Sequence, residues 1–346
     1  MKISRYIKVK DRLIMLMIVC IISNVILAIF SIDYLRKMEN NSVLMYEQRL
    51  LAMNAFTDFE GTIVAGGTKL GVSGLAGDLQ TKYGKAIQTV GYVPRGRKNL
   101  IDSRYQKIHL TTSEDFSARE PLQGWIDLAA SGVQPSTVRL LGIQGGDISA
   151  TEYRIALALG ATVGLLKGSG GSSDEIMKDP DWQGASKLLL IPEDPMTLRV
   201  FLSPATPSMH DSKMRRSIAQ AIHEVYRKEQ INNLMKKQES MAAWNKLLPG
   251  FVDSNLQQAD HIVEKLRLID CEVVSVKDRP VALMTFTAEE IETLSEFEHG
   301  RWNIERFKDG WRYGPEKNVE KKISPYLIPW KDISMEVKEY DRTTVK

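Results

Sequence analysis

The stretch GTIVAGGTKLGVSG, residues 61–74, decides the fold of the first half of this chain. Residues 61–65 form a short apolar run typical of a buried strand, and Gly66 and Gly67 end that run. Residues 72–83 then follow the spacing of an amphipathic helix. A glycine turn before a helix lets backbone N–H groups approach a phosphate, which the helix dipole also attracts. Taken alone, the stretch is also compatible with a plain strand-to-helix turn.

Strand and helix patterns alternate between residues 85 and 191. This alternation predicts an α/β fold, with a Rossmann-like doubly wound parallel sheet between two layers of helices. The predicted strands are residues 85–93, 108–110, 138–143, 161–166 and 188–191, and the predicted helices are 121–130 and 151–159. The segment GSGGSS, residues 168–173, is expected to be a flexible loop.

A second glycine pair, Gly145 and Gly146, follows the predicted strand at residues 138–143. In parallel sheets, ligands bind outside the carboxyl ends of the strands, where glycine turns meet helix N-termini. Lys69 is otherwise an exposed turn lysine, and the hydroxyl groups near the turns otherwise cap helices. The candidate ligand-binding residues are Gly66, Gly67, Thr68, Lys69, Gly71, Ser73, Gly74, Gly145, Gly146, Asp147 and Ser149.

The first turn resembles the nucleotide-binding turn of the SLOG superfamily, which includes phosphoribohydrolases, DprA-like proteins and the sensor domains of TRPM channels. Residues 145–152, GGDISATE, resemble the Pro-Gly-Gly-x-Gly-Thr-x-x-Glu motif of the phosphoribohydrolases. Gln144 replaces its proline, and Ile148 and Ser149 replace its Gly-Thr. The resemblance implies nucleotide binding, with Glu152 and Arg119 as candidate catalytic residues for an N-glycosidic bond. Glu152 is equally explained as a carboxylate that complements the helix dipole.

The C-terminus carries four clusters of aromatic, glycine and charged residues: 298–302 (EHGRW), 310–315 (GWRYGP), 329–331 (PWK) and 339–342 (EYDR). Their order resembles the RyR domain, the repeated module of ryanodine receptors, over residues 287–346. In bacterial proteins this module usually accompanies ligand-sensing or nucleotide-related domains. Its aromatic residues are expected to form the core of a small helical module, or else a box for an anionic ligand or partner; the residues singled out are Arg301, Trp302, Trp311, Tyr313 and Trp330.

A weaker copy of this pattern precedes the module. The sequence HEVY at residues 223–226 parallels residues 299–302, and WNKL at 244–247 parallels residues 330–333. The copy lacks a Gly-Trp-x-Tyr-Gly segment, which makes it a degenerate RyR-like repeat. The predicted domains are a membrane anchor with a juxtamembrane helix at 1–56, a SLOG-like domain at 57–207, the degenerate repeat at 208–280 and the RyR domain at 281–346.

Residues 13–31 are apolar with no charged side chain, which predicts a single membrane-spanning helix. Residues 1–56 resemble the start of bacterial chemoreceptor sensor domains, although the rest of that bundle is missing. Lysine and arginine are more frequent before the apolar run than after it, and this bias places the later domains outside the cytoplasm. A nucleotide-sensing domain belongs inside, so a cytoplasmic location is expected despite the bias, and a fusion remnant is the alternative.

Composition narrows the function classes. A net charge of +3, with 26% charged residues, gives no sign of nucleic-acid binding, and two cysteines provide no metal or disulfide framework. The sequence predicts a membrane-tethered sensor that binds a nucleotide or nucleotide-derived small molecule, requires no cofactor and uses its RyR modules for a second ligand or a protein partner. The alternatives are a nucleotide N-glycosidase and a protein-binding adaptor, and the oligomeric state is left open.

Overall fold

The computed structural model describes residues 44–45, 47–48, 50–56, 59–182, 184–203, 212–232, 239–271 and 285–345. One compact unit extends from Leu50 to the C-terminus. Residues 50–55, at the end of the predicted juxtamembrane region, are helical, and Ala52, Ala55 and Phe56 pack into the core of this unit. Within the described ranges, no helix has the length and apolar character needed to cross a membrane. The predicted membrane segment at residues 13–31 lies outside these ranges.

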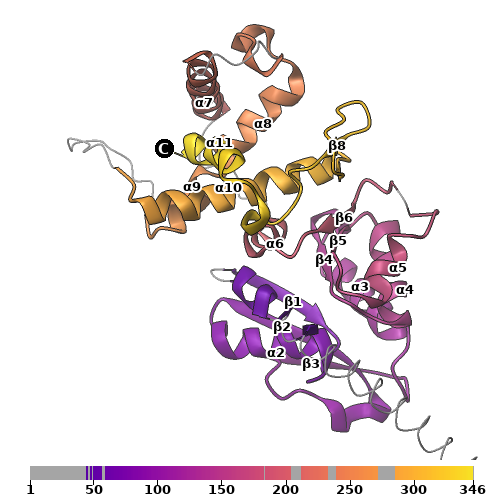
Figure 1. The fold of residues 1–346 in the computed structure, drawn as a ribbon. Helices are drawn as coiled ribbons and strands as arrows, with labels where there is room; N and C mark the ends of the chain where they lie inside the picture. Colours follow the sequence, from indigo (N-terminus) through magenta and orange to yellow (C-terminus); the bar gives the residue numbers. More distant parts are fainter. Residues whose placement is uncertain are drawn as a thin grey trace, which may run out of the picture. The chain divides into compact units, whose positions relative to one another are not determined.

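The first sheet is parallel and three-stranded, in the order β1 (Gly61–Ala65), β2 (Ile87–Pro94), β3 (Lys107–Thr111) (Figure 1). Helix α2 (Gly71–Tyr83) covers one face, where the hydroxyl of Thr89 in β2 donates to Gln80 of α2. Helix α3 (Arg119–Ala130) covers the other face, where the hydroxyl of Tyr92 donates to Asp127. Thr89 and Tyr92 have opposite parity along the strand, so their side chains point to opposite faces.

The second sheet is also parallel and three-stranded, in the order β4 (Arg139–Gly142), β5 (Thr162–Leu166), β6 (Leu188–Ile191). Val163 and Leu165 of β5 pack with residues of α4 (Asp147–Ala158) and α5 (Gly171–Ile176) in one apolar cluster. Leu166 points to the opposite face and packs with residues of α6 (Pro195–Leu202). The strand and helix positions therefore confirm the predicted mixed α/β class, whereas the predicted continuous sheet is present as two parallel sheets.

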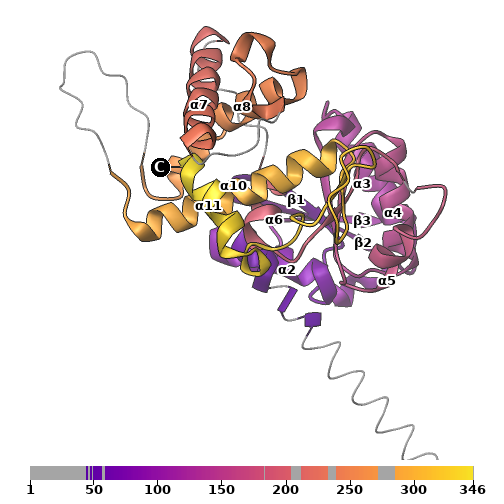
Figure 2. The ribbon, with the colours of Figure 1, turned by 45° about the horizontal axis from the view of Figure 1, so that its top comes forward.

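The C-terminal half is helical. Helices α7 (Ser212–Asn232) and α8 (Pro249–Asp260) pack side by side and are followed by the short α9 (Ile262–Arg267) (Figure 2). The long helix α10 (Ala288–Lys308) packs against both α6 and α11 (Met335–Val345). Between α10 and α11 lie a two-stranded parallel pair, β7 (Arg312–Tyr313) and β8 (Ile323–Ser324), and a 3₁₀ turn, η5 (Trp330–Asp332).

Helices α6 and α10 cross at Gly300, where the backbones come close together. A Cβ atom at this position would lie 2.8 Å from the backbone carbonyl carbon of Met196 and 2.8 Å from the backbone nitrogen of Thr197. Next to the crossing, the side-chain amide of Asn303 donates to the hydroxyl of Thr197 at 3.4 Å. Glycine is therefore required here by the space between two backbones.

We expect Gly300→Ala to lower the free energy of unfolding by about 1–3 kcal/mol, because the added methyl group forces two packed helices apart. The matched control is Gly250→Ala in α8, where an added Cβ would meet no atom within 4 Å. That control should be neutral or slightly stabilising, since alanine restricts the unfolded chain more than glycine does. Urea denaturation of both variants measures the difference, and equal stabilities would contradict the proposed close crossing.

Candidate functional site

The first glycine turn is held against the end of β2. Gly67 has a φ of +70°, and a Cβ atom there would lie 2.7 Å from Cγ2 of Val93. The N–H of Asp102 donates to the carbonyl of Gly67 at 2.9 Å, and Thr68 forms an antiparallel bridge with Ile101. Both the backbone conformation and the available space therefore require glycine at position 67.

The other residues predicted for this turn divide into two groups. The N–H of Gly66 donates to the hydroxyl of Ser73 at 3.1 Å, and the carbonyl of Gly74 accepts from the guanidinium of Arg104. These contacts maintain the turn itself. Lys69 is exposed, and Gly71 adopts a φ of +58° with open space around its α-carbon. Lys69 and Gly71 therefore take no part in the contacts that maintain the turn.

The second glycine turn is joined to the loop that follows β5. The carbonyl of Gly145 accepts from the N–H of Ser172 at 3.0 Å, and the N–H of Gln144 donates to the hydroxyl of Ser169 at 2.9 Å. The carbonyl of Gln144 accepts from both the N–H and the hydroxyl of Ser173. The serine side chains at 169, 172 and 173 are buried. The prediction of a flexible loop at residues 168–173 is therefore wrong, because its serines satisfy the polar groups of the neighbouring turn.

Both turns lead into helices whose first-turn N–H groups have no side-chain cap. Leu70 occupies the N-cap of α2 and Gly146 that of α4, and neither provides a capping hydrogen bond. Asp194 caps α6 and Thr287 caps α10, whereas α3 and α8 also lack a side-chain cap. A Cβ atom at Gly146 would meet no atom within 4 Å, so the space in front of α4 is open. Uncapped N–H groups and the positive end of the helix dipole together favour an anion.

The two turns follow strands that share one apolar core. Ile63 of β1 and Leu141 of β4 pack against the same cluster. Val72, in the first turn of α2, packs there too, together with Ile143, which immediately precedes the second turn. Both turns therefore follow strands that contribute to one apolar core. Each of the two predicted turns thus precedes a helix N-terminus without a side-chain cap, α2 or α4.

Glu152 and Arg119 are not brought into contact. Glu152 lies on α4, half-buried, and burial raises the pKa of its carboxyl group to about 7. Among the described residues, it has no ion-pair partner. Arg119 is exposed at the first residue of α3, where it lines a cavity of about 930 Å³ that also includes Tyr92 and His109 but not Glu152. No hydrogen bond or ion pair in the described ranges joins Arg119 to Glu152, although their helices α3 and α4 pack against each other.

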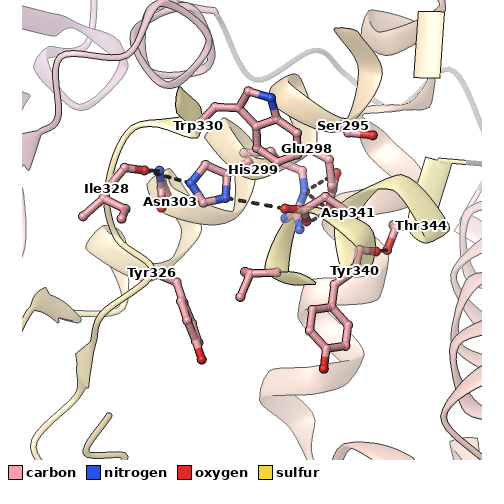
Figure 3. Close-up of polar contacts among 12 residues, drawn as sticks. Ser295, Glu298, His299, Asn303, Tyr326, Ile328, Trp330, Tyr340, Asp341 and Thr344 are labelled. Atoms are coloured by element: carbon pink, nitrogen blue, oxygen red, sulfur yellow. Dashed lines mark hydrogen bonds and ion pairs between the residues drawn. The ribbon is translucent and has the colours of Figure 1, made fainter. Parts of the chain in front are cut away.

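In the C-terminal module, one histidine connects three elements (Figure 3). The Nε2 atom of His299 on α10 lies 2.8 Å from the carbonyl oxygen of Ile328, and its Nδ1 atom lies 3.5 Å from a carboxylate oxygen of Asp341 on α11. Burial alone would lower the pKa of His299, but the hydrogen bond and charge of Asp341 outweigh burial, so the pKa is raised. Burial also raises the pKa of Asp341.

A group of buried charges lies next to this histidine. Arg301, 1% exposed, forms ion pairs with Glu298 at 2.7 Å and with Glu305 at 2.6 Å. Lys265 of α9 contributes a second cation to Glu298 at 2.6 Å. Burial alone would raise the pKa of Glu298, but Arg301 and Lys265 hold it well below its usual range. Arg301 is therefore a core residue, and it is not available to an external anion.

The aromatic residues of the module have different roles. Trp330 is 5% exposed and packs beside His299, with ring centroids 5.6 Å apart. The guanidinium of Arg306 lies over the rings of both Trp302 and Trp311. Tyr313 is 50% exposed, and the ammonium group of Lys167 lies 4.7 Å from its ring centroid. These contacts favour the core interpretation of Trp330 over an open aromatic box, and they place Tyr313 against the loop after β5.

The preceding helices repeat the histidine–tryptophan arrangement. The Nε2 atom of His223 on α7 lies 2.8 Å from the carbonyl oxygen of Ala242, two residues before Trp244. In the C-terminal module, His299 contacts the carbonyl of Ile328, also two residues before a tryptophan. The ring centroids of His223 and Trp244 are 5.8 Å apart at 53°, close to the 5.6 Å and 50° of the second pair.

The C-terminal module corresponds to a known family. A family model described as the RyR domain matches residues 276–346, so this part of the chain carries an RyR domain. The match confirms the resemblance inferred from the four aromatic and charged clusters. No curated protein matches the chain.

Sequence patterns missed the side chains that support the site. Ser169, Ser172 and Ser173 have a composition typical of a linker, and only the folded loop shows that they bind the second turn. Asp102 and Arg104 form an ion pair at 2.7 Å beneath the first turn. One feature of the sequence could have predicted the role of these serines. Residues 168–173 directly follow a predicted strand, which is typical of a third glycine loop.

We expect Glu152→Gln to stabilise the protein above pH 7. The folded-state pKa of Glu152 is raised relative to an unfolded chain, so the wild type loses stability as pH rises through about 7. Glutamine stays neutral, so the variant avoids this loss. Its free energy of unfolding should exceed that of the wild type by about 1–3 kcal/mol at pH 8.5 and by almost nothing at pH 4. Urea denaturation at the two pH values measures it, with exposed Glu175→Gln as the control. A gain that does not change with pH would contradict this interpretation.

Asp341→Asn tests the raised pKa of His299. A raised histidine pKa contributes stability that is complete below about pH 6.5 and is lost as pH rises through the folded-state pKa. The variant loses the partner carboxylate, so its deficit against the wild type should be largest near pH 6 and smaller at pH 9. Denaturation curves between these values check the trend, and Asp332→Asn, an exposed carboxylate of the same module, should show no trend.

Proposed function

We propose that residues 57–207 form a SLOG-like domain that binds a nucleotide or nucleotide-derived ligand at its two glycine turns. The observation that carries this proposal is the pair of uncapped helix N-termini, α2 and α4, each placed directly after a glycine turn at the carboxyl end of a parallel strand. A phosphate group satisfies such N–H groups and interacts favourably with the dipoles of both helices.

The strand orders support a Rossmann-like arrangement. Within each sheet the order is β1-β2-β3 or β4-β5-β6, and β1 and β4 are both edge strands. If β1 and β4 lie next to each other, the combined order becomes 3-2-1-4-5-6, which is the order of dinucleotide-binding folds. The ligand crevice of such folds lies at the point where the order reverses, beyond the ends of strands 1 and 4. In that combined order, both glycine turns would lie at this point.

We further propose that the RyR domain responds to the bound ligand, as an output unit or as a second ligand-binding unit. Tyr313 contacts Lys167, two residues before Ser169, and Ser169 in turn binds the second glycine turn. A ligand that shifts this turn therefore acts on a segment that touches the RyR domain. The matching histidine–tryptophan geometry of α7 and α10 supports a degenerate RyR-like repeat at residues 208–280.

A second candidate function is hydrolysis of an N-glycosidic bond. The observation that favours it is Glu152, whose pKa of about 7 suits a general acid or base at neutral pH. No hydrogen bond or ion pair joins Arg119 to this residue in the described part of the chain, so we place binding first. Incubation of the purified chain with AMP or ADP-ribose separates the two. Release of free base that disappears in Glu152→Gln would replace the binding proposal with the enzymatic one.

Gly146→Leu provides a direct test of binding. Its backbone is extended (φ −112°), which any residue adopts, and the position faces open space, so the apo protein should melt normally. The leucine side chain would fill the space in front of α4 and prevent a phosphate from reaching its N–H groups. We expect nucleotides that raise the melting temperature of the wild type to leave this variant unchanged.

The matched control is Gly250→Leu, at an exposed glycine with open space in α8. Its ligand-induced shift should equal that of the wild type. Gly67 is a poorer choice for this test because its Cβ would clash with Val93 and disturb the fold. Wild-type protein that shows no shift with any nucleotide, or a Gly146→Leu variant with an undiminished shift, would overturn the proposal.

A further inference from the structure

A basic turn lies beside the first glycine turn. The 3₁₀ segment η1 (Arg95–Leu100, RGRKNL) begins directly after β2, and all six of its residues are exposed. The residue that follows it, Ile101, forms the antiparallel bridge with Thr68 of the glycine turn. The register of the parallel strands, with Ala65 opposite Gly91, brings the ends of β1 and β2 side by side. The basic turn therefore lies at the same edge of the sheet as the first glycine turn.

The charges of this region are unequally compensated. Arg97 pairs with Asp115 at 2.5 Å, and Arg104 pairs with Asp102 at 2.7 Å. Arg95, Lys98 and Lys69 are exposed and have no ion-pair partner within the described part of the chain. The two turns together thus present three exposed cations without an ion-pair partner, next to the exposed carboxylate of Glu114 beside Gly96, and Lys69 also helps lower the pKa of Asp102.

The end of the second strand has a known role in parallel nucleotide-binding sheets. There, an acidic side chain near the end of the second strand accepts a hydrogen bond from a ribose hydroxyl, whereas an arginine accommodates a phosphate on that hydroxyl. In this chain β2 ends at Pro94, and the next residue is Arg95. Glu114 and Asp115 approach η1 from the loop after β3, and Asp115 already pairs with Arg97. Asp102 is fully buried and paired, so it is not available to a hydroxyl group.

We infer that the ligand of this site carries a second phosphate, attached to a ribose hydroxyl and bound by Arg95 and Lys98. The inference rests on the proposed function, because the glycine turns must hold the first phosphate. An exposed pair of cations attracts a phosphate and forms charge-assisted hydrogen bonds with it, whereas an unmodified hydroxyl group gains little from either. The ligand class is therefore a ribose-phosphorylated nucleotide.

Three nucleotides distinguish this class from its alternatives. AMP carries only the first phosphate, ADP carries the second in a linear chain, and adenosine 2′,5′-bisphosphate carries it on the ribose. Binding to the purified full-length chain is measured by calorimetry at fixed salt, because phosphate contacts depend on salt. We expect the 2′,5′-bisphosphate to bind about tenfold more tightly than AMP or ADP, the gain of one charge-assisted contact.

The variants separate the inference from the proposed function. The double variant Arg95→Ser/Lys98→Ser should bind all three nucleotides with the affinity of AMP, while Lys317→Ser/Lys321→Ser, with the same change in net charge at exposed RyR-domain positions, should retain the preference. Equal binding of ADP and the 2′,5′-bisphosphate, or a preference that survives the double variant, overturns the inference and leaves the glycine-turn site standing. Absence of binding by every nucleotide overturns both.

Discussion

The carboxylate of Asp194 connects the two halves of the described structure. One of its oxygens caps α6 by accepting from the N–H and the hydroxyl of Thr197, at 2.7 and 2.6 Å. The other accepts from the N–H of Trp330 at 3.3 Å, within the RyR domain. Asp194 is 2% exposed, so each of these donors would otherwise be buried without a partner. This bond, together with the close crossing at Gly300, fixes α10 against the last helix of the α/β part.

The buried ion pairs of the RyR domain depend on that fixed position. Arg301 and Glu298 lie in an environment where isolation of either charge would be very unfavourable, and Lys265 and Glu305 complete the pairing. Lys265 comes from α9, and Ser254 of α8 donates to Glu305. The network therefore links the RyR domain to the helices that precede it. The first four residues of the cluster EHGRW are thus explained by packing: a paired acid, a bridging histidine, a helix crossing and a buried guanidinium.

In the glycine turns, by contrast, some polar groups are paired and others are not. Their internal hydrogen bonds are satisfied by Ser73, Ser169 and Ser173, while the first N–H groups of α2 and α4 have no side-chain cap. Glu152, on α4, retains a carboxyl group with a raised pKa and no ion-pair partner in the described ranges. Uncapped helix N-termini and desolvated carboxyl groups are found at functional sites, but they also occur elsewhere in this structure: α3 and α8 lack a side-chain cap, and burial raises the pKa of Glu296 to about 7. The contact between Lys167 and Tyr313 gives the site a physical connection to the RyR domain.

The sequence alone determined the element types, because apolar periodicity and glycine turns are local properties; strand β6 was predicted at residues 188–191 and lies there. The sequence alone also predicted the RyR domain, because its aromatic and charged clusters follow the order typical of the family within one continuous segment. Only the tertiary structure decided which charges are buried: Arg301 looked like an anion-binding arginine until Glu298, Glu305 and Lys265 were seen around it. It likewise brought Asp194 to Trp330. Such relationships join residues far apart in the chain, and pairing across that distance is set by packing, which no local pattern encodes.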